Sequence, residues 1–234
     1  MERFHEKVVA KQRPREIVIA PPQHGKSTVM SRYFPAWVFG KSPDLAIILG
    51  AYASDWADSF SLDVQRVMDS SYYHEIFPDT IIPGLFATRG SGTARSQDYF
   101  EIVGREGRFR SAGRGKGVTG RPADILLIDD PVKNAEEALS EAVREGTWQW
   151  YDQDLSSRLQ EGAGVMLTLT RWHLDDLAGR LIEAMRTSPR ADQWKIHLFP
   201  ALTGVEGYEQ ALQSGLSEEI AQRFLTPLIR TSLQ

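Results

Sequence analysis

The segment 17–28 combines residue types that could bind phosphate. An apolar run ends in Ala-Pro-Pro-Gln-His-Gly-Lys-Ser-Thr, which matches the loop pattern G-x-x-x-x-G-K-[ST] with Ala20 at the first glycine position. The N-terminus of the helix expected next would present free N–H groups to phosphate, and Gly25 would allow a close approach. We expect Lys26 to contact the outer phosphates and the Ser27 hydroxyl to bind Mg²⁺. The alternative is an exposed turn that matches by chance, which the strand-like run before the loop disfavours.

The phosphate-contacting residues expected from this loop are Pro22, Gln23, His24, Gly25, Lys26, Ser27 and Thr28. Among them, His24 is interpreted as a loop contact and not as a catalyst.

Two carboxylates follow another apolar run, 125–128. Hydrolysis of a bound nucleotide needs a carboxylate that serves Mg²⁺ and a group that orients or deprotonates water. We assign Asp129 to Mg²⁺ and Asp130 to water activation, because ligands of open α/β sheets bind beyond the carboxyl ends of the strands. The alternative is that Asp-Asp-Pro only ends a strand and begins a turn. Adjacent carboxylates raise the pKa of one another, and Mg²⁺ would keep both ionised.

A third run, 165–170, ends in hydroxyl groups and precedes Arg171-Trp172-His173. Thr168 and Thr170 would lie on the same face of a strand. The alternative is a strand of β-branched residues followed by an ordinary loop.

Apolar runs alternate with helical patterns along the chain, which predicts an α/β fold whose mostly parallel sheet carries helices on both faces. Strands are expected at 16–20, 45–52, 124–128, 165–170 and 194–199, with a hairpin of 99–103 and 108–111. Helices are expected at 3–12, 26–39, 54–68, 135–159 and 174–185, with one or two short helices beyond 203. Segment 69–98 is expected to be irregular, and Ser54 and Asp55 are candidate helix caps.

The composition is that of a soluble globular protein. The chain is 41% hydrophobic and 25% charged, and its 234 residues suffice for one large core or for one domain with a small appendage. The absence of cysteine excludes disulfides and thiolate metal sites, and fits a reducing compartment. No apolar run reaches the length of a membrane span, and the N-terminus lacks a signal-peptide core. A net charge of −4 excludes a surface coated in positive charge and leaves room for a local basic strip.

Together, the motifs resemble the ATPase half of the large terminase subunit of tailed bacteriophages. The resemblance rests on PPQHGKS (21–27), VTGRPADILLIDDPVKN (118–134) and TLTRWHLDDLAGRL (168–181), and covers residues 3–202. It implies a P-loop NTPase fold with an added strand, 165–170, between the phosphate-loop strand and the acidic-pair strand. It also implies that Asp130 is the catalytic carboxylate, where many relatives have Glu, and that Thr168 and Thr170 sense the γ-phosphate.

The resemblance implies an ATP- and Mg²⁺-dependent motor that drives double-stranded DNA into a procapsid in the host cytoplasm. The implied partners are the portal or procapsid, the small terminase subunit and further copies of this chain in a ring, with a monomer in isolation as the alternative. A helicase-like or repair DNA-dependent ATPase and a truncated, non-hydrolysing nucleotide-binding module stay open. We expect residues 1–203 to form the ATPase domain and 204–234 a short helical tail or linker, too short for a nuclease domain.

Two departures from the family pattern concern the nucleotide. Relatives often carry arginine inside the loop where this chain has Pro22, Gln23 and His24, so a charge contact is lost or replaced. By the resemblance, we expect the family's adenine-contacting segment before the first strand to be shortened here, which puts adenine selectivity in doubt.

A glycine-rich segment, 113–121, places three cations before the acidic strand. It could supply an arginine finger, which stabilises charge on the γ-phosphate from a neighbouring subunit. It could instead contact the DNA backbone, or be a solvated basic loop. By resemblance, Arg114 is the first candidate for the finger and Arg121 the second.

Other conspicuous residues are interpreted as structural. Trp148, Trp150 and Tyr151 have a spacing more typical of packing than of base stacking. His173 beside the acidic pair 175–176 is interpreted as a helix start and not as a metal cluster.

Overall fold

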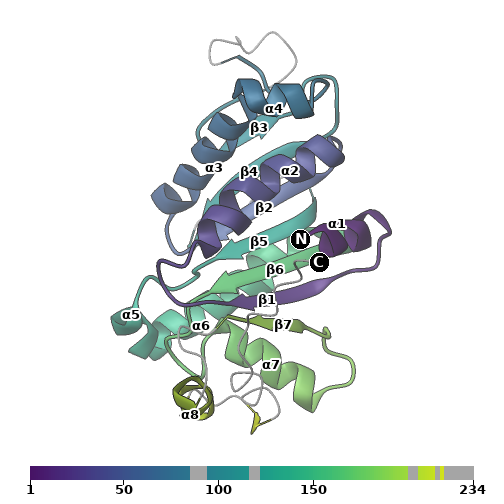
Figure 1. Cartoon of the computed structure of the whole chain (residues 1–234). Helices are drawn as coiled ribbons and strands as arrows, with labels where there is room; N and C mark the ends of the chain where they lie inside the picture. The colour runs from purple at the N-terminus through teal and green to yellow at the C-terminus, as the bar shows by residue number, and fades with distance from the viewer. Residues whose placement is uncertain (85–93, 116–121, 200–204, 214–216, 219–234) are drawn as a thin grey trace.

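The strands of this chain form one seven-stranded sheet in a computed structural model (Figure 1), which describes residues 1–84, 94–115, 122–199, 205–213 and 217–218. The spatial order is β3-β4-β2-β5-β6-β1-β7. Among the named strands of the described residues, β3–β4 is the one antiparallel pair, so the predicted α/β fold with a mostly parallel sheet and the predicted hairpin are confirmed. The strands are β1 (Arg15–Ile19), β2 (Ala46–Ala51), β3 (Tyr99–Glu101), β4 (Arg108–Gly113), β5 (Ala123–Asp129), β6 (Leu159–Leu169) and β7 (Lys195–Leu198).

Strand β6 lies between β1 and β5, as predicted for the added strand. Leu167 pairs with Ile17 of β1 on one side and with Ile128 of β5 on the other. The strand starts at Leu159 and not at 165, because Leu159 pairs with Ala123 of β5 before a register shift, ahead of a polar and glycine-containing stretch. Because this start is polar and contains glycines, it is not an apolar run, and the sequence therefore did not predict it as part of the strand.

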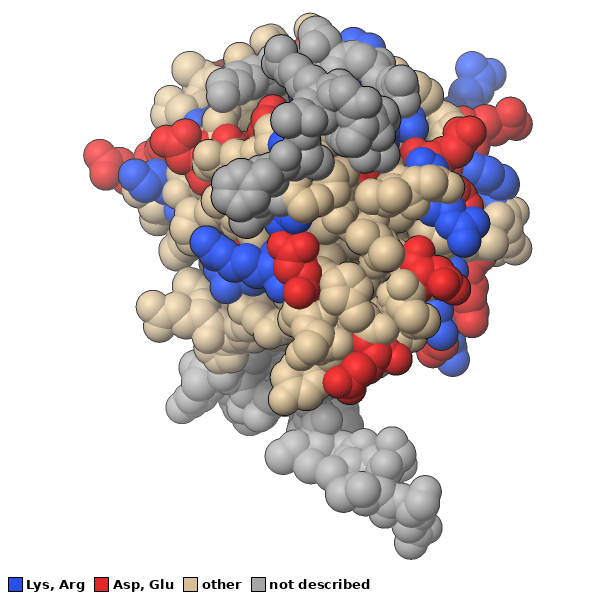
Figure 2. Space-filling model, turned by 90° about the horizontal axis from the view of Figure 1, so that it is seen from above, with Lys and Arg blue, Asp and Glu red and all other residues tan. Residues whose placement is uncertain are grey.

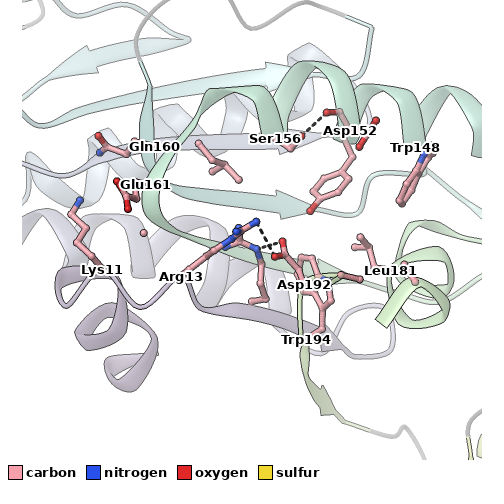
Figure 3. Close-up of a pocket in the computed structure, with 16 residues that line it drawn as sticks. Lys11, Arg13, Trp148, Asp152, Ser156, Gln160, Glu161, Leu181, Asp192 and Trp194 are labelled. Atoms are coloured by element: carbon pink, nitrogen blue, oxygen red, sulfur yellow. Dashed lines mark hydrogen bonds and ion pairs between the residues drawn. The ribbon is translucent and has the colours of Figure 1, made fainter. Parts of the chain in front are cut away.

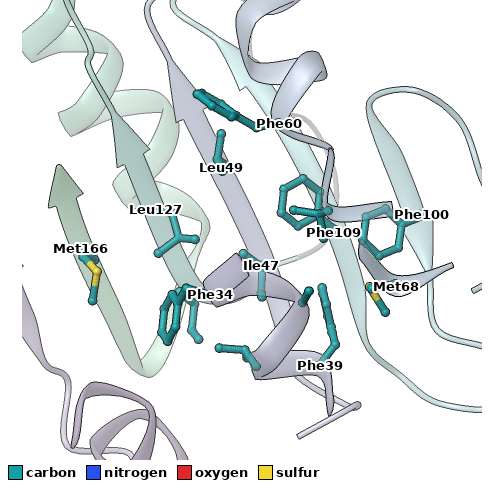
Figure 4. Close-up of a cluster of buried hydrophobic side chains, with 14 of the residues drawn as sticks. Phe34, Phe39, Ile47, Leu49, Phe60, Met68, Phe100, Phe109, Leu127 and Met166 are labelled. Carbon is teal, nitrogen blue, oxygen red and sulfur yellow. The ribbon is translucent and has the colours of Figure 1, made fainter. Parts of the chain in front are cut away.

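Helices cover both faces of the sheet (Figure 1). One face carries α1 (Glu2–Val9), α2 (Phe34–Lys41), α3 (Ser54–Met68) and α4 (Ser71–Ile76), and the other carries α6 (Glu141–Gln149) and α7 (Leu177–Thr187). The short helices α5 (Ala135–Leu139) and α8 (Val205–Gln213) complete the described set. Figure 4 shows the aromatic core of the first face, where side chains of α2 and α3 meet those of β2, β3, β4, β5 and β6.

The helix after the glycine-lysine-serine sequence is continuous from Lys26 to Lys41 but changes geometry. Residues Thr28–Tyr33 form a π-helical segment that leads directly into α2. Pro35 explains the change, since a proline lacks the N–H that an α-helix needs and its ring collides with the carbonyl four residues earlier. Helix 26–39 was therefore predicted in the right place but without its π segment.

Three expectations about helices were wrong. The predicted long helix 135–159 is divided, because Ser140 is extended and caps α6 by accepting the Val143 N–H. After α6, the chain continues through a π-helical segment, Trp150–Leu155, and a single 3₁₀ turn before it enters β6. Neither Ser54 nor Asp55 caps α3, because the helix already includes them and its N-cap is Ala53. Segment 69–98 contains α4 and is not wholly irregular.

Charges of both signs intermingle on the face seen from the α4 and β3 end of the molecule (Figure 2). Ion pairs neutralise three cations on or near α3: Arg32 and Arg66 with Asp63, and Arg95 with Asp69. Within the described residues, no helix has the length and apolar character that crossing a membrane requires.

Gly50 of β2 provides a test of the packing between the sheet and the second face. A Cβ atom at Gly50 would lie 2.7 Å from Cη2 of the buried Trp150, so Gly50→Ala should lower the free energy of unfolding by about 1–3 kcal/mol. Gly146→Ala is the matched control, because nothing lies within 4 Å of its Cβ position. Gly146 lies inside α6, so its replacement by alanine should raise the free energy of unfolding by up to about 1 kcal/mol. Urea unfolding measures both, and equal effects of the two variants would contradict this packing.

Candidate functional site

The carboxyl ends of β1, β6 and β5 bring the three sequence motifs to one edge of the sheet. The loop 20–27 follows β1, Thr170 follows β6, and Asp129 and Asp130 end β5 and follow it. Because β6 separates the other two strands, Thr170 stands between the loop and the acidic pair. The strand order thus joins motifs that are far apart in the sequence.

The loop has the backbone conformation of an anion-binding turn. Gln23 and Gly25 have φ angles of 61° and 76°, in the left-handed region where glycine is favoured. His24 Nδ1 lies 2.7 Å from the Pro22 carbonyl, as expected for a loop contact. The Val29 N–H donates to the Gly25 carbonyl at 3.0 Å, so the helix begins directly after the loop. Its first N–H groups therefore emerge at the sheet edge, where they suit an anion.

The carboxylate of Asp130 joins two of the motifs. Lys26 Nζ lies 2.8 Å from Asp130 Oδ2, and the Thr170 N–H donates to Asp130 Oδ1 at 2.9 Å. The lysine side chain is 8% exposed and the aspartate side chain 25% exposed, so the ion pair lies at the mouth of the site. Asp130 has a φ of 40°, a strained conformation for a non-glycine residue, of the kind that accumulates at functional sites.

Thr170 also contacts the start of the phosphate loop. Its hydroxyl donates to the Ala20 carbonyl at 3.2 Å, while the carbonyl of buried Thr168 accepts the Asp130 N–H at 2.9 Å. The end of β6 is therefore bonded to the loop on one side and to Asp130 on the other.

Asp129 is almost wholly buried behind this ion pair. Its Oδ2 accepts a hydrogen bond from the Ser31 hydroxyl at 2.9 Å, and the Ser27 hydroxyl lies near the same carboxylate. Its Oδ1 is buried and has no hydrogen-bond partner among the described residues. Burial, followed by repulsion from Asp130, raises the pKa of Asp129 to about 6.

Ser31 is the contact that the sequence analysis missed. It lies four residues after Ser27, on the same face of the helix, and that spacing was the available signal.

Arg114, the first arginine-finger candidate, is bound within its own chain. Its guanidinium donates to Glu137 Oε2 at 3.1 Å and to Thr147 Oγ1 at 3.0 Å, and its side chain is 20% exposed. These contacts tie the end of β4 to α5 and α6. Arg121, the second candidate, lies outside the described residues.

The residues interpreted as structural have structural surroundings. Trp150 and Tyr151 are 3% and 6% exposed in the core, as predicted. Asp176 caps α7 by accepting the Gly179 N–H, and Asp175 pairs with Arg144 and Arg180. In the part of the chain that the structure describes, no group of three or more His, Cys, Asp or Glu residues is placed to hold a metal ion.

A cavity of about 710 Å³ lies at the opposite edge of the sheet, beside the amino ends of β1 and β6 (Figure 3). Arg13 and Arg15 line it and share the carboxylate of Asp192. These cations are neutralised and far along the strands from the phosphate loop, so the cavity does not belong to the candidate site.

The raised pKa of Asp129 predicts how stability depends on pH in the absence of divalent metal. The ordinary pKa of 3.8 applies to the unfolded chain, so between pH 4 and about 6 the unfolded chain loses a proton that the folded chain keeps. The free energy of unfolding should therefore fall as pH rises through this range, by about 2–3 kcal/mol relative to Asp129→Asn. Denaturant titrations at several pH values measure the difference. If the difference in free energy of unfolding between the wild type and Asp129→Asn is constant from pH 4 to 7, the pKa of Asp129 is not raised.

Comparisons with known proteins agree with this architecture. Residues 17–222 match the family model described as "Terminase large subunit, T4likevirus-type, N-terminal". No curated protein matches the sequence. The large terminase of bacteriophage HK97 is similar in structure, with a TM-score of 0.52 and 14% identity over 94% of this chain and 44% of that chain. The large terminase of the thermophilic bacteriophage D6E is similar with a TM-score of 0.51 and 11% identity, over 90% of this chain and 49% of that chain.

This chain thus spans just under half the length of either solved terminase. At these identities the structures establish the shared fold, while the family match, which extends over most of the sequence, establishes descent. The chain belongs to the family of terminase large subunits, of the T4-like virus type, and corresponds to their N-terminal part.

Proposed function

We propose that this chain is the Mg²⁺-dependent ATP-hydrolysing motor domain of a phage terminase large subunit. The observation that carries the proposal is the Asp130 carboxylate, held between the Lys26 ammonium and the Thr170 amide at the mouth of a phosphate-binding loop. A helicase-like ATPase and a non-hydrolysing module are the alternatives, and the family match favours the terminase function over both.

Each residue has a role that its position suits. The loop residues and the first N–H groups of the helix bind the phosphates, with Pro22, Gln23, His24, Gly25 and Thr28 around Lys26 and Ser27. The terminal phosphate competes with Asp130 for the Lys26 ammonium. Once released from Lys26, the Asp130 carboxylate accepts a hydrogen bond from the attacking water and orients it.

Mg²⁺ fits the residues present. Asp129 Oδ1 is a buried carboxylate oxygen without a hydrogen-bond partner among the described residues, and the Ser27 hydroxyl lies against the same carboxylate. When bound, Mg²⁺ neutralises charge on the phosphate oxygens. Asp129 and Ser27 would hold it, and its charge would keep the buried carboxylate ionised.

Thr170 gives the site a route to the rest of the fold. Its hydroxyl and its N–H bond to the loop and to Asp130, so a change in the Lys26–Asp130 pair reaches β6 through a single residue. We propose that Thr168 and Thr170 couple loss of the γ-phosphate to motion of the elements that follow.

The partners of the proposed motor are double-stranded DNA, the portal or procapsid, the small subunit and further copies of this chain in a ring, in the host cytoplasm. The division into residues 1–203 and 204–234, and the absence of nuclease activity from this chain, stay predictions.

Removal of either end of the ion pair should abolish ATP hydrolysis in different ways. Lys26→Ala should lose ATP binding, whereas Asp130→Asn should bind ATP and hydrolyse it about 10²–10⁴-fold more slowly. The measurement is steady-state phosphate release with Mg²⁺, with and without double-stranded DNA and procapsids. Lys41→Ala, an exposed lysine at the end of the same helix, is the control. A wild-type rate no higher than that of the two variants would sink the enzymatic role.

Arg114→Ala should abolish turnover, by about 10³–10⁵-fold, and leave ATP binding nearly intact, if its guanidinium stabilises the transferred phosphate from a neighbouring subunit. Glu137→Gln breaks the same intramolecular ion pair but keeps the arginine, so it should retain turnover. Phosphate release and ATP binding are measured for both variants under assembly conditions. Wild-type turnover in Arg114→Ala, or equal loss in the two variants, would show that Arg114 only ties β4 to α5 and α6.

A further inference from the structure

The strand order indicates on which side of β1 the phosphates and the base of a nucleotide would lie. Asp129, Asp130 and Thr170 all lie on the β6 and β5 side of β1. The phosphate that reacts must lie near these groups. The opposite side of β1 is occupied by β7, so the base end of a nucleotide leads toward the carboxyl end of β7.

Phe199 is the residue at that end. Its N–H donates to the Ile19 carbonyl at 2.8 Å, which extends the β1–β7 ladder by one residue. Since Ile19 pairs with Leu198, Phe199 stands beside Ala20, the first residue of the phosphate loop. The aromatic ring is therefore carried by the backbone that adjoins the loop.

The alternation of β7 determines the face on which this ring lies. Ile196 and Leu198 pack against the core cluster that includes Leu177 and Leu181 of α7. Phe199 directly follows the strand and its N–H continues the β1–β7 ladder, so the same alternation, carried on by one residue, assigns Phe199 to the opposite face. Val18, a member of the other core cluster, lies on that face. Phe199 is 51% exposed on this face, and an aromatic ring left half in water beside a nucleotide loop offers a free surface for a base.

The N-terminal helix does not compete for this position. α1 is bound at the far end of the loop helix, where His5 Nε2 lies 2.9 Å from Ser42 Oγ and the His5 ring contacts Trp37. Figure 1 shows α1 near the start of β1, away from its carboxyl end. Within the described residues, the carboxyl end of β1 therefore adjoins β7 and not α1.

We propose that Phe199 is the stacking platform for the nucleobase, an inference that rests on the proposed nucleotide site. Stacking on a ring uses the π-face that every base has, so this contact strengthens binding without selecting adenine. The chain would bind a nucleoside triphosphate through Phe199 at one end and through Lys26 at the other.

The test compares ATP, GTP and inorganic tripolyphosphate by calorimetric titration of the full chain with Mg²⁺. Phe199→Ala should weaken ATP and GTP binding alike, by roughly fivefold to a hundredfold, and leave tripolyphosphate binding unchanged. Phe199→Trp keeps a ring and should bind ATP nearly as the wild type does. Tyr72→Ala, which removes a 77% exposed ring from α4, should change nothing.

Each other outcome is decisive. If Phe199→Ala binds ATP within twofold of the wild type while Lys26→Ala loses both ATP and tripolyphosphate, the stacking role is wrong and the nucleotide site stands. If Phe199→Ala weakens tripolyphosphate as much as ATP, the residue acts on the loop and not on the base, and the inference fails. If Lys26→Ala changes neither ligand, the nucleotide site itself is refuted.

Discussion

The contact on which the candidate site depends is the double interaction of the Asp130 carboxylate with the Lys26 ammonium and the Thr170 amide. It joins three segments that local sequence cannot join, and it holds Asp130 in a strained left-handed conformation. The insertion of β6 between β1 and β5 makes the contact possible, because it places Thr170 within reach of both Ala20 and Asp130. A different strand order would leave the same motifs on separate parts of the sheet edge.

The charges at the sheet edge are the basis for the proposed metal-bound phosphate. Two adjacent carboxylates face one lysine, and the inner one, Asp129, is buried with one oxygen lacking a protein partner among the described residues. Burial and the neighbouring charge raise its pKa, so the ionised form needs further positive charge. In the proposed site a divalent cation would supply that charge, while Ser31 donates a hydrogen bond to the carboxylate from the helix.

The sequence predicted those elements that hydrophobic periodicity or a short motif reports. Buried parallel strands are continuous apolar runs, which located β1, β2, β5 and the second half of β6. It was less informative where the cause is a single residue or a tertiary pairing. The π-helical turn before Pro35 and the break at Ser140 have local causes that hydrophobic periodicity does not report, and the polar start of β6 depends on its pairing with β5. The intramolecular partner of Arg114, Glu137, is likewise a tertiary contact, so the finger assignment stays a prediction.

Motifs in the sequence named the candidate residues at the sheet edge, whereas the Ser31 contact and the proposed role of Phe199 came from the structure. A crystal structure of the full chain with Mg²⁺ and a non-hydrolysable ATP analogue tests the account most directly. The account predicts that the terminal phosphates lie in the loop 20–27 and that Lys26 Nζ has moved from Asp130 to a phosphate oxygen. The Thr170 N–H would keep its bond to Asp130. Phosphates bound elsewhere, with Lys26 and Asp130 still 2.8 Å apart, would contradict it.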